Sequence, residues 1–210
     1  MTYTLDQVLE RYPQLKSIAN TLEAARDLMV KKAQEGKLFL VAGNGGSSAD
    51  ADHIVGELMK SFVRKRPIED AIARQLSEIG GDAGSRIASN LEGAVQAICL
   101  SSHHALSTAF MNDVDPSLVY AQQVYGYGNP GDLFIGISTS GNAQNVLNAA
   151  LVARAKGLSV LGLTGESGGA LTEHCDVCIQ VPERETFKVQ ELHLPIYHWL
   201  CIEIEAALWS

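Results

Sequence analysis

The sequence Gly43-Asn44-Gly45-Gly46-Ser47-Ser48 follows an apolar run at residues 38–42 and precedes an amphipathic segment. This order predicts a strand, a glycine-rich turn and a helix. Glycine lets the backbone pass close to a ligand, and the first turn of a helix presents free N–H groups and the positive end of its dipole. The stretch therefore predicts a site for an anionic group such as phosphate.

The same predicted helix carries two residues suited to proton transfer. His53 and Glu57 are four residues apart, so they lie on one face of the helix and can reach the same substrate or metal ion. An imidazole and a carboxylate are the usual general acids and bases of enzymes. Phosphate binding and acid–base chemistry are thus expected on a single element.

Short apolar runs recur along the chain, separated by stretches of helical length. They occupy residues 38–42, 97–100, 133–137, 160–163 and 177–181. Nearly continuous apolar strands that alternate with helices are typical of a parallel sheet covered on both faces. We expect a three-layer, doubly wound (Rossmann-like) α/β fold with a five-stranded parallel sheet. In such folds, ligands bind at the carboxyl ends of the strands, where the strand order reverses.

A second turn with hydroxyl side chains follows the third strand. Its sequence is Ser138-Thr139-Ser140-Gly141-Asn142, and a further small turn, at residues 164–169, follows the fourth strand. Hydroxyls and turn amides at a helix start can hold a phosphate. One glycine-rich turn is often only a matter of tight packing. Two such turns in one sheet favour a phosphorylated ligand.

Two other phosphate-binding motifs do not fit the glycine-rich stretch. A dinucleotide fingerprint needs a third glycine where Ser48 stands, and a second strand that ends in an acidic residue about 20 positions later. A Walker A loop needs Gly-Lys followed by Ser or Thr, which is absent here.

Composition limits the class of protein. The 210 residues are 46% hydrophobic and 19% charged, which fits one globular domain. A net charge of −8 argues against nucleic-acid binding, because that affinity comes from Lys and Arg. No apolar run approaches the roughly 20 residues of a membrane helix, and the first residues lack the pattern of a secretory signal. We expect a cytoplasmic protein without a membrane partner.

The N-terminal part, residues 1–36, predicts helices. Thr4 and Gln7 have the spacing of a capping box, and Pro13 should interrupt or restart the helix. A narrow apolar seam follows, with steps of three and four residues: Leu15, Ile18, Leu22, Ala25 and Met29. Such a seam packs either against a partner subunit or over the domain's own sheet, and the pattern alone leaves both open.

Residues 64–95 look like a helical insertion. Apolar residues recur at helical spacing there, with a glycine-rich break at Gly80-Gly81. The cluster Arg64-Lys65-Arg66 lies at its start, beside the proposed phosphate site. A solvated basic face is a commoner explanation for such a cluster than ligand binding.

The four cysteines are sparse. Cys175 and Cys178 form a CxxC, but no second pair accompanies it, and Cys178 is flanked by strand-like apolar residues. Buried structural thiols are the favoured interpretation of all four, and a redox or zinc site at the CxxC is the minor alternative.

The last segment, from Lys188 to Trp209, predicts an amphipathic helix. Gln190 and His198 fall within about 100° of one another around it, so their face can look toward Glu57. Pro195 lies in the segment, so the helix should begin only a few residues earlier or be kinked there.

Taken together and in this order, these motifs resemble the sugar isomerase (SIS) domain family over about residues 36–208. Within it, the chain looks most like the phosphoheptose isomerases, which interconvert sedoheptulose 7-phosphate and a heptose 7-phosphate. The resemblance implies a homotetramer with active sites between subunits, the helices of residues 1–36 helping to build the assembly, and an SIS domain over residues 37–210. It implies Glu57 as general base and His198 as general acid, with proton transfer between C1 and C2 through an enediol.

The resemblance also implies ligand-binding roles. Zinc, which some members hold, would be bound by His53, Glu57, Gln190 and His198. The substrate would be bound by Asn44, Gly45, Gly46, Ser47, Asp113, Ser138, Thr139, Ser140, Asn142 and Gln190.

Some positions depart from the family pattern. His103 stands where relatives carry an acidic acceptor for a substrate hydroxyl, and Ala143 stands where a serine is common. These departures leave a second reading open, a non-catalytic SIS module that binds a sugar phosphate or a protein as a regulator. Retention of Glu57 and His198 favours the isomerase.

Overall fold

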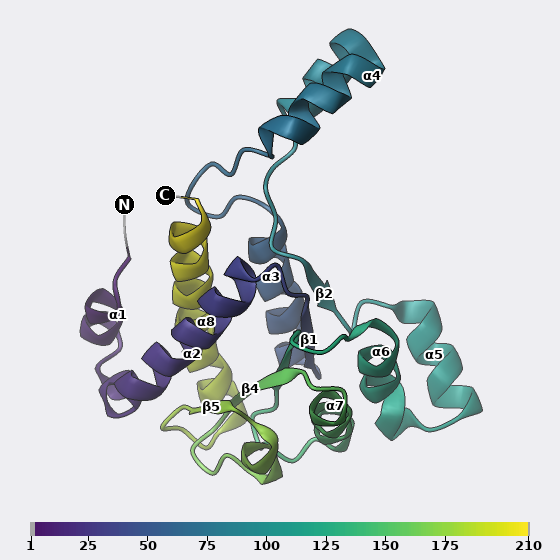
Figure 1. The fold of residues 1–210 in the computed structure, drawn as a ribbon. Coiled ribbons are helices and arrows are strands. Elements are labelled where there is room, and N and C mark those ends of the chain that lie inside the picture. Colours follow the sequence, from purple (N-terminus) through teal and green to yellow (C-terminus); the bar gives the residue numbers. More distant parts are fainter. Residues whose placement is uncertain (1–2, 210) are drawn as a thin grey trace.

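The computed structural model describes residues 3–209 and contains a five-stranded, all-parallel sheet (Figure 1). Its strands are β1 (Phe39–Gly43), β2 (Ala97–Cys99), β3 (Leu133–Ile137), β4 (Ser159–Thr164) and β5 (Val177–Gln180). The strand order is β2-β1-β3-β4-β5, so the order reverses between β1 and β3. The predicted doubly wound α/β fold is confirmed, and each strand lies within one or two residues of its predicted position.

Alternate residues of the central strands enter two separate cores. On one face, Phe39 and Val41 pack with α1 (Leu5–Arg11), α2 (Ala19–Gln34), α3 (Gly46–Met59) and α8 (Thr186–Leu208). On the other, Leu40 and Ala42 pack with α6 (Val119–Tyr127) and α7 (Gln144–Ala155). Strands buried on both faces cannot alternate polar and apolar residues, which explains their nearly continuous apolar sequence. The remaining helices are α5 (His104–Asp113) and the 3₁₀ segments η1 (Pro13–Ile18), η2 (Pro116–Leu118) and η3 (Ala170–His174).

The N-terminal helices pack on their own domain. The predicted capping box of Thr4 and Gln7 is present, and Pro13 starts a 3₁₀ turn. Leu22, Ala25 and Met29 of the apolar seam are buried against α8 and β5. Of the two alternatives for the seam, the structure shows intramolecular packing.

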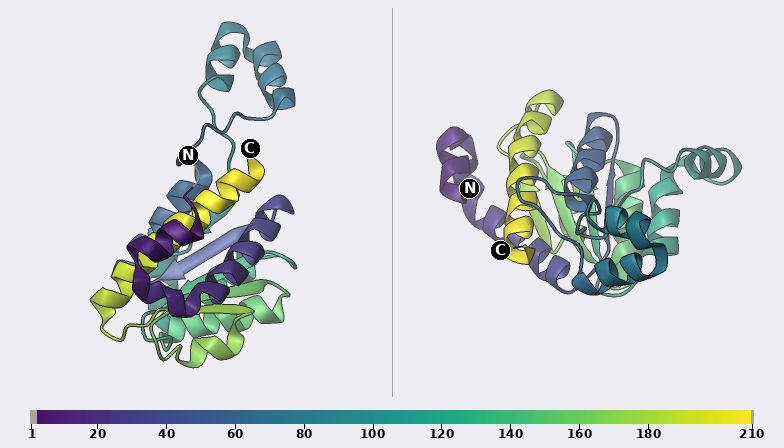
Figure 2. Two further views of the ribbon diagram at one scale, coloured as in Figure 1. Left: turned by 90° about the vertical axis from the view of Figure 1, so that its left-hand side faces the viewer. Right: turned by 90° about the horizontal axis from the view of Figure 1, so that it is seen from above.

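The insertion forms a helical hairpin, α4 (Asp70–Ala88), that projects from the body on two extended segments (Figures 1 and 2). The chain reverses at Gly81, whose φ of 53° is readily adopted only by glycine. At the base of the hairpin, Pro67 and Glu92 form an isolated antiparallel bridge. Exposed side chains on the hairpin include Ile72, Ile79 and Ile87, with Ile79 87% exposed.

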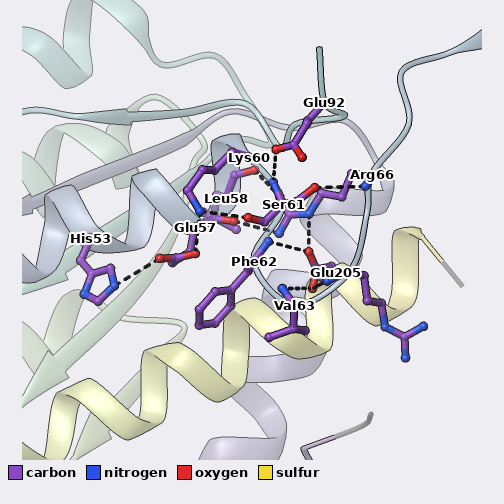
Figure 3. A network of polar contacts seen from close by, with 11 residues as sticks. His53, Glu57, Leu58, Lys60, Ser61, Phe62, Val63, Arg66, Glu92 and Glu205 are labelled. Carbon is purple, nitrogen blue, oxygen red and sulfur yellow. Dashed lines mark hydrogen bonds and ion pairs between the residues drawn. The ribbon is translucent and has the colours of Figure 1, made fainter. Parts of the chain in front are cut away.

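A buried ion pair ties the start of the insertion to the last helix (Figure 3). Nε of Arg66 donates to Oε1 of Glu205 at 2.7 Å, and both side chains are almost fully buried. The two terminal nitrogens of Arg66 donate to the carbonyls of Leu58 and Glu57, at the C-terminal end of α3. Arg66 therefore joins α3 to α8, and the predicted solvated basic face is wrong for this residue.

The Glu205 carboxylate also accepts hydrogen bonds from the backbone. The N–H groups of Phe62, Val63 and Arg64 donate to its two oxygens at 2.9–3.0 Å. Burial alone would raise the pKa of Glu205, but these donors and the Arg66 guanidinium outweigh burial, so the pKa lies below the usual 4.5. The carboxylate is therefore charged at neutral pH and fixes the path of the chain after α3.

Two further sequence interpretations need correction. Pro195 lies in the interior of α8, which begins at Thr186, so the alternative of a helix that starts only a few residues before the proline is wrong, and the alternative of a kink there stays a prediction. Cys175 and Cys178 are half-buried, so the prediction of buried thiols holds only for Cys99 and Cys201.

Replacing Arg66 with Met should strongly destabilise the fold. The change leaves Glu205 buried without its cationic partner, and breaking a buried pair in this way costs about 3–5 kcal/mol. Urea denaturation at pH 7 measures the loss in the free energy of unfolding. The exposed neighbour gives the control, since Lys65→Met should change stability by no more than about 0.5 kcal/mol. Equal stability of the two variants would contradict the assigned role.

Candidate functional site

The two predicted phosphate turns lie at the point where the strand order reverses. β1 and β3 are paired in parallel, with Gly43 opposite Ile137, so the turns that follow them leave the sheet side by side. α3 begins at Gly46 and α7 at Gln144, and the positive dipole ends of both helices lie next to these turns. The geometry suits a phosphate group.

Side chains of the two turns are joined directly. Asn44 and Asn145 exchange a reciprocal pair of hydrogen bonds, each of 2.9 Å. The Tyr120 hydroxyl donates to the carbonyl of Gly43 at 2.7 Å and lies 3.2 Å from Oδ1 of Asn44. Burial raises the pKa of Tyr120 to about 12, so it remains a donor at neutral pH. These contacts fix the first turn before any ligand arrives.

Close packing explains why glycine is needed in the first turn. A Cβ on Gly43 would lie 2.4 Å from the backbone oxygen of Ser47, and one on Gly46 would lie 2.5 Å from Nε2 of Gln190. Gln190 of α8 therefore reaches the start of α3, and its predicted role in substrate binding stays a prediction. Gly45 adopts a φ of 57° and turns the chain into α3.

Some polar side chains of the second turn form hydrogen bonds to the backbone of the protein itself. Ser138 is buried, and its Oγ accepts from the N–H of Ala143 at 3.4 Å. The Asn142 side chain donates to the carbonyl of Ser140 and accepts from the N–H of Ala170. Thr139 and Ser140 line a cavity of about 630 Å³ together with Asn142 and with the turn after β4. Three predicted substrate-binding residues, Thr139, Ser140 and Asn142, thus lie at an open cavity.

A second cluster lies further along α3. Nε2 of His53 is 3.3 Å from Oε1 of Glu57 on the next turn, and Figure 3 shows the two side chains directed toward one another. The His198 ring of α8 lies edge-on to His53, with centroids 4.9 Å apart. The structure therefore brings together three of the residues that the sequence singled out, His53, Glu57 and His198.

A short hydrogen-bonded chain orients His53. Its Nδ1 lies 3.1 Å from the Tyr197 hydroxyl, which donates to Oδ1 of Asp50 at 3.2 Å. Burial raises the pKa of Tyr197 and also that of Asp50. Neither Asp50 nor Tyr197 was predicted as a site residue. The sequence held a signal for each of them. Asp50 lies three residues before His53 on the same helix, and Tyr197 is next to His198.

The predicted catalytic pair has two polar atoms without a hydrogen bond. Nε2 of His198 and Oε2 of Glu57 are buried, and neither has a hydrogen-bond partner among residues 3–209, although Nζ of Lys60 lies 3.6 Å from Oε2 of Glu57. Buried polar groups in proteins are nearly always paired, so such atoms mark a place for a ligand. Burial and the neighbouring His53 lower the pKa of His198, while Glu57 acts against this shift. The His198 imidazole is therefore neutral at pH 7 and can both accept and donate a proton.

The four predicted zinc ligands are not brought together. Within residues 3–209, no group of three or more His, Cys, Asp or Glu side chains is arranged to hold a metal ion. Gln190 and His198 are eight residues apart on a continuous helix, a rise of roughly 12 Å. Gln190 contacts Gly46, whereas His198 contacts His53.

Two residues in the chain segment after β2 lie apart from this cluster. Asp113 is exposed at the end of α5 and accepts from its neighbour Asn112. The His103 ring lies 5.5 Å from that of Tyr127 on α6. No hydrogen bond of the described residues connects Asp113 to Glu57 or to the phosphate turns, and its predicted contact with the substrate stays a prediction.

His193 has a structural position. It is fully buried, and its Nε2 donates to the carbonyl of Thr164, at the end of β4, at 3.2 Å. Burial lowers its pKa to about 4. This neutral imidazole fixes α8 to the sheet at the edge where the turns lie.

The family of the chain follows from comparison with known proteins. A model of the SIS domain matches residues 4–108 and 77–165. The chain belongs to the SIS domain family. Among curated relatives, phosphoheptose isomerase of Aneurinibacillus thermoaerophilus is 33% identical over 194 residues, covering 92% of this chain and 85% of that protein. Phosphoheptose isomerase 2 of Campylobacter jejuni is 37% identical over 182 residues, covering 87% and 78%.

Solved SIS structures agree with the sequence relatives. A phosphoheptose isomerase from Francisella tularensis superposes with a TM-score of 0.76 at 28% identity, covering 96% of this chain and 93% of that one. The predicted resemblance is therefore confirmed at the level of family and fold. No helix within residues 3–209 of this SIS chain has the length and apolar character needed to cross a membrane.

The buried His193 should make the stability of this SIS domain depend on pH. The unfolded chain protonates this residue below about pH 6.5, whereas the folded chain does so only near pH 4, so the free energy of unfolding should fall as pH decreases through this window. In His193→Gln, whose amide can still donate to Thr164, that dependence should shrink. Urea denaturation at pH 7, 6 and 5 measures the slope. The exposed His104→Gln is the control, and an unchanged slope in His193→Gln would contradict this assignment.

Proposed function

We propose that the chain is an aldose–ketose isomerase that converts sedoheptulose 7-phosphate to a heptose 7-phosphate. The observation that carries the proposal is the pair of buried atoms on adjoining helices, Oε2 of Glu57 and Nε2 of His198, that accept or donate no hydrogen bond within residues 3–209. The phosphoheptose isomerases to which the chain is similar support the choice of substrate.

The chemistry assigns one role to each residue. Isomerisation moves a proton between C1 and C2 and a second proton between the two oxygens, through an enediol. The Glu57 carboxylate, which contacts His53 at Oε1 and lies 3.6 Å from Nζ of Lys60 at Oε2, would take the carbon-bound proton with Oε2, which makes no hydrogen bond within residues 3–209. The neutral imidazole of His198 would pass a proton to one oxygen and accept one from the other. A donor that is neutral at pH 7 suits this exchange, because it needs no net change of charge.

The phosphate would bind at the turns after β1 and β3. The two helix N-termini and the hydroxyls of Thr139 and Ser140 support this placement. The amides of the first turn, Asn44 to Ser47, would share the phosphate with the second turn. Gln190, which lies against Gly46, would contact the sugar next to the phosphate.

Zinc stays part of the proposal only at the Glu57 end of the site. His53, Glu57 and His198 supply suitable donor types, but as described they are not arranged to hold a metal ion, so zinc binding would require their side chains to move or a ligand from a neighbouring chain. Gln190 would not complete the set from the same chain, because it lies two turns of α8 away. A zinc ion bound there would polarise the sugar oxygens. The proton transfers assigned to Glu57 and His198 do not require it.

We further propose that the protein is a homotetramer whose sites lie between subunits. Glu57 lies eleven residues along α3 from Gly46, a rise of roughly 16 Å, so the acid–base pair and the phosphate turns of one chain are far apart for a single sugar phosphate. The apolar side chains of α4 are exposed, and a short hairpin that stands free of its own body gains its stability from packing against another chain.

The location in the cell is a separate prediction. A cytoplasmic location stays a prediction, supported by the absence of disulfides among the four cysteines.

Purified protein should isomerise sedoheptulose 7-phosphate, measured by product formation with and without added zinc. Glu57→Gln and His198→Ala should each lower turnover by roughly 10²–10⁴-fold, since each removes one partner in proton transfer. The exposed residues Glu191 and His104 give matched controls, and Glu191→Gln and His104→Ala should keep full turnover. Tight binding of the sugar phosphate without conversion by the wild-type protein would contradict the isomerase and favour a regulatory SIS module.

Co-expression of two inactive chains tests the shared site. Glu57→Gln removes the base, and Ser140→Asp places a negative charge at the phosphate turn. If one subunit supplies the turn and its neighbour the base, mixed oligomers should recover up to about a quarter of wild-type turnover by random assembly. No recovery, in oligomers shown by mass spectrometry to contain both chains, would place each site within one chain.

A further inference from the structure

The two half-buried cysteines meet over a glycine in the sheet. Cys178 on β5 lies opposite Gly162 on β4, and Cys175 ends the 3₁₀ turn just before β5. A Cβ on Gly162 would lie 2.7 Å from the sulfur of Cys175 and 3.0 Å from that of Cys178. The missing side chain of Gly162 thus opens the space that both sulfur atoms share.

The two thiols have different hydrogen-bond partners. The Cys175 thiol donates to the carbonyl of Leu171 at 3.2 Å, and the Cys178 sulfur lies 3.8 Å from the hydroxyls of Thr164 and Thr172. The neighbouring Cys175 thiol, first among several causes, lowers the pKa of Cys178 to about 6. The neighbouring Cys178, burial and the nearby Asp176 raise the pKa of Cys175. The surroundings of the pair therefore favour the thiolate at Cys178 and the thiol at Cys175.

The pair is also open to small molecules. Cys175 and Cys178 line a surface cavity of about 450 Å³ between η3, β5 and α2. The other two thiols, Cys99 and Cys201, are buried. Access and thiolate character together separate a reactive cysteine from a structural one.

We propose that Cys175 and Cys178 form a redox-active dithiol that reduces low-molecular-weight disulfides, such as glutathione disulfide, and closes to an intramolecular disulfide. The Cys178 thiolate attacks one sulfur of the small disulfide, forming a mixed disulfide and releasing one thiolate. Cys175 then loses its proton and attacks the Cys178 sulfur, which releases the second thiolate. The dithiol gives up two electrons, and the small disulfide becomes two thiols, one of which takes the proton from Cys175 and the other a proton from water.

The site lies close to the anchor of α8. The sulfur of Cys178 is 3.8 Å from the Thr164 hydroxyl, and the carbonyl of Thr164 accepts from His193. Oxidation would thus act on β4 next to the turn at residues 164–169. The proposal is independent of the isomerase function, because neither cysteine belongs to the acid–base cluster or the phosphate turns.

To test the proposal, the native full-length protein is treated with glutathione disulfide at pH 7, and the remaining thiols are then blocked by alkylation. The mass of the tryptic fragment of residues 157–184, which contains both cysteines, is measured by mass spectrometry. The expected product is that fragment two hydrogens lighter and without label. In Cys175→Ser, a mixed disulfide should persist on Cys178, because no second thiol displaces it. In Cys178→Ser, the initial reaction should be at least about tenfold slower than in the wild type, because the thiolate is gone.

The buried cysteine gives a control. Cys99→Ser should close the same disulfide at the wild-type rate. Full alkylation of both Cys175 and Cys178 after treatment that completely oxidises a reference dithiol would overturn the proposal. Equal rates for Cys178→Ser and the wild type would do so as well.

Discussion

The buried pair of Arg66 and Glu205 holds the two helices of the candidate site in one geometry. Arg66 caps the last carbonyls of α3, and Glu205 on α8 fixes the backbone at residues 62–64. Glu57 lies on the first of these helices and His198 on the second. Because a charge buried without its partner is costly, the pair tolerates little sliding of one helix past the other. Arg66 and Glu205 therefore set the distance between the proposed acid and base, although neither has a proposed role in substrate binding or proton transfer.

The fold separates binding of phosphate from proton transfer. The phosphate turns depend on the sheet, since they follow β1 and β3 and are joined by Asn44 and Asn145. The acid–base cluster depends on helix packing over one face of that sheet. A change in one part can leave the other intact, so a relative with the same fold could keep its ligand and lose its reaction.

Local patterns were sufficient to predict much of this structure. Apolar runs placed the five strands, and the spacing of His53 and Glu57 placed both on one face of α3. The roles of Arg66, Tyr120 and Asn145 were not predictable in this way, because each depends on a contact with a residue far away in the chain. Gln190 was grouped with His198 by its angle around the helix, but the rise along α8 separates them. The angle around a helix does not give the distance along it, so two side chains can share a face without meeting.

The bridge between Pro67 and Glu92 has a consequence for the evolution of the chain. It brings the two segments of the insertion together at the body, and Gly93 donates to the carbonyl of Arg66 beside it. Once these ends are closed, lengthening or shortening the hairpin changes the entropy of loop closure only slowly. The hairpin can therefore be lost, extended or exchanged between lineages without rebuilding the sheet. It is the part of this chain where one member of the family can acquire a surface that others lack.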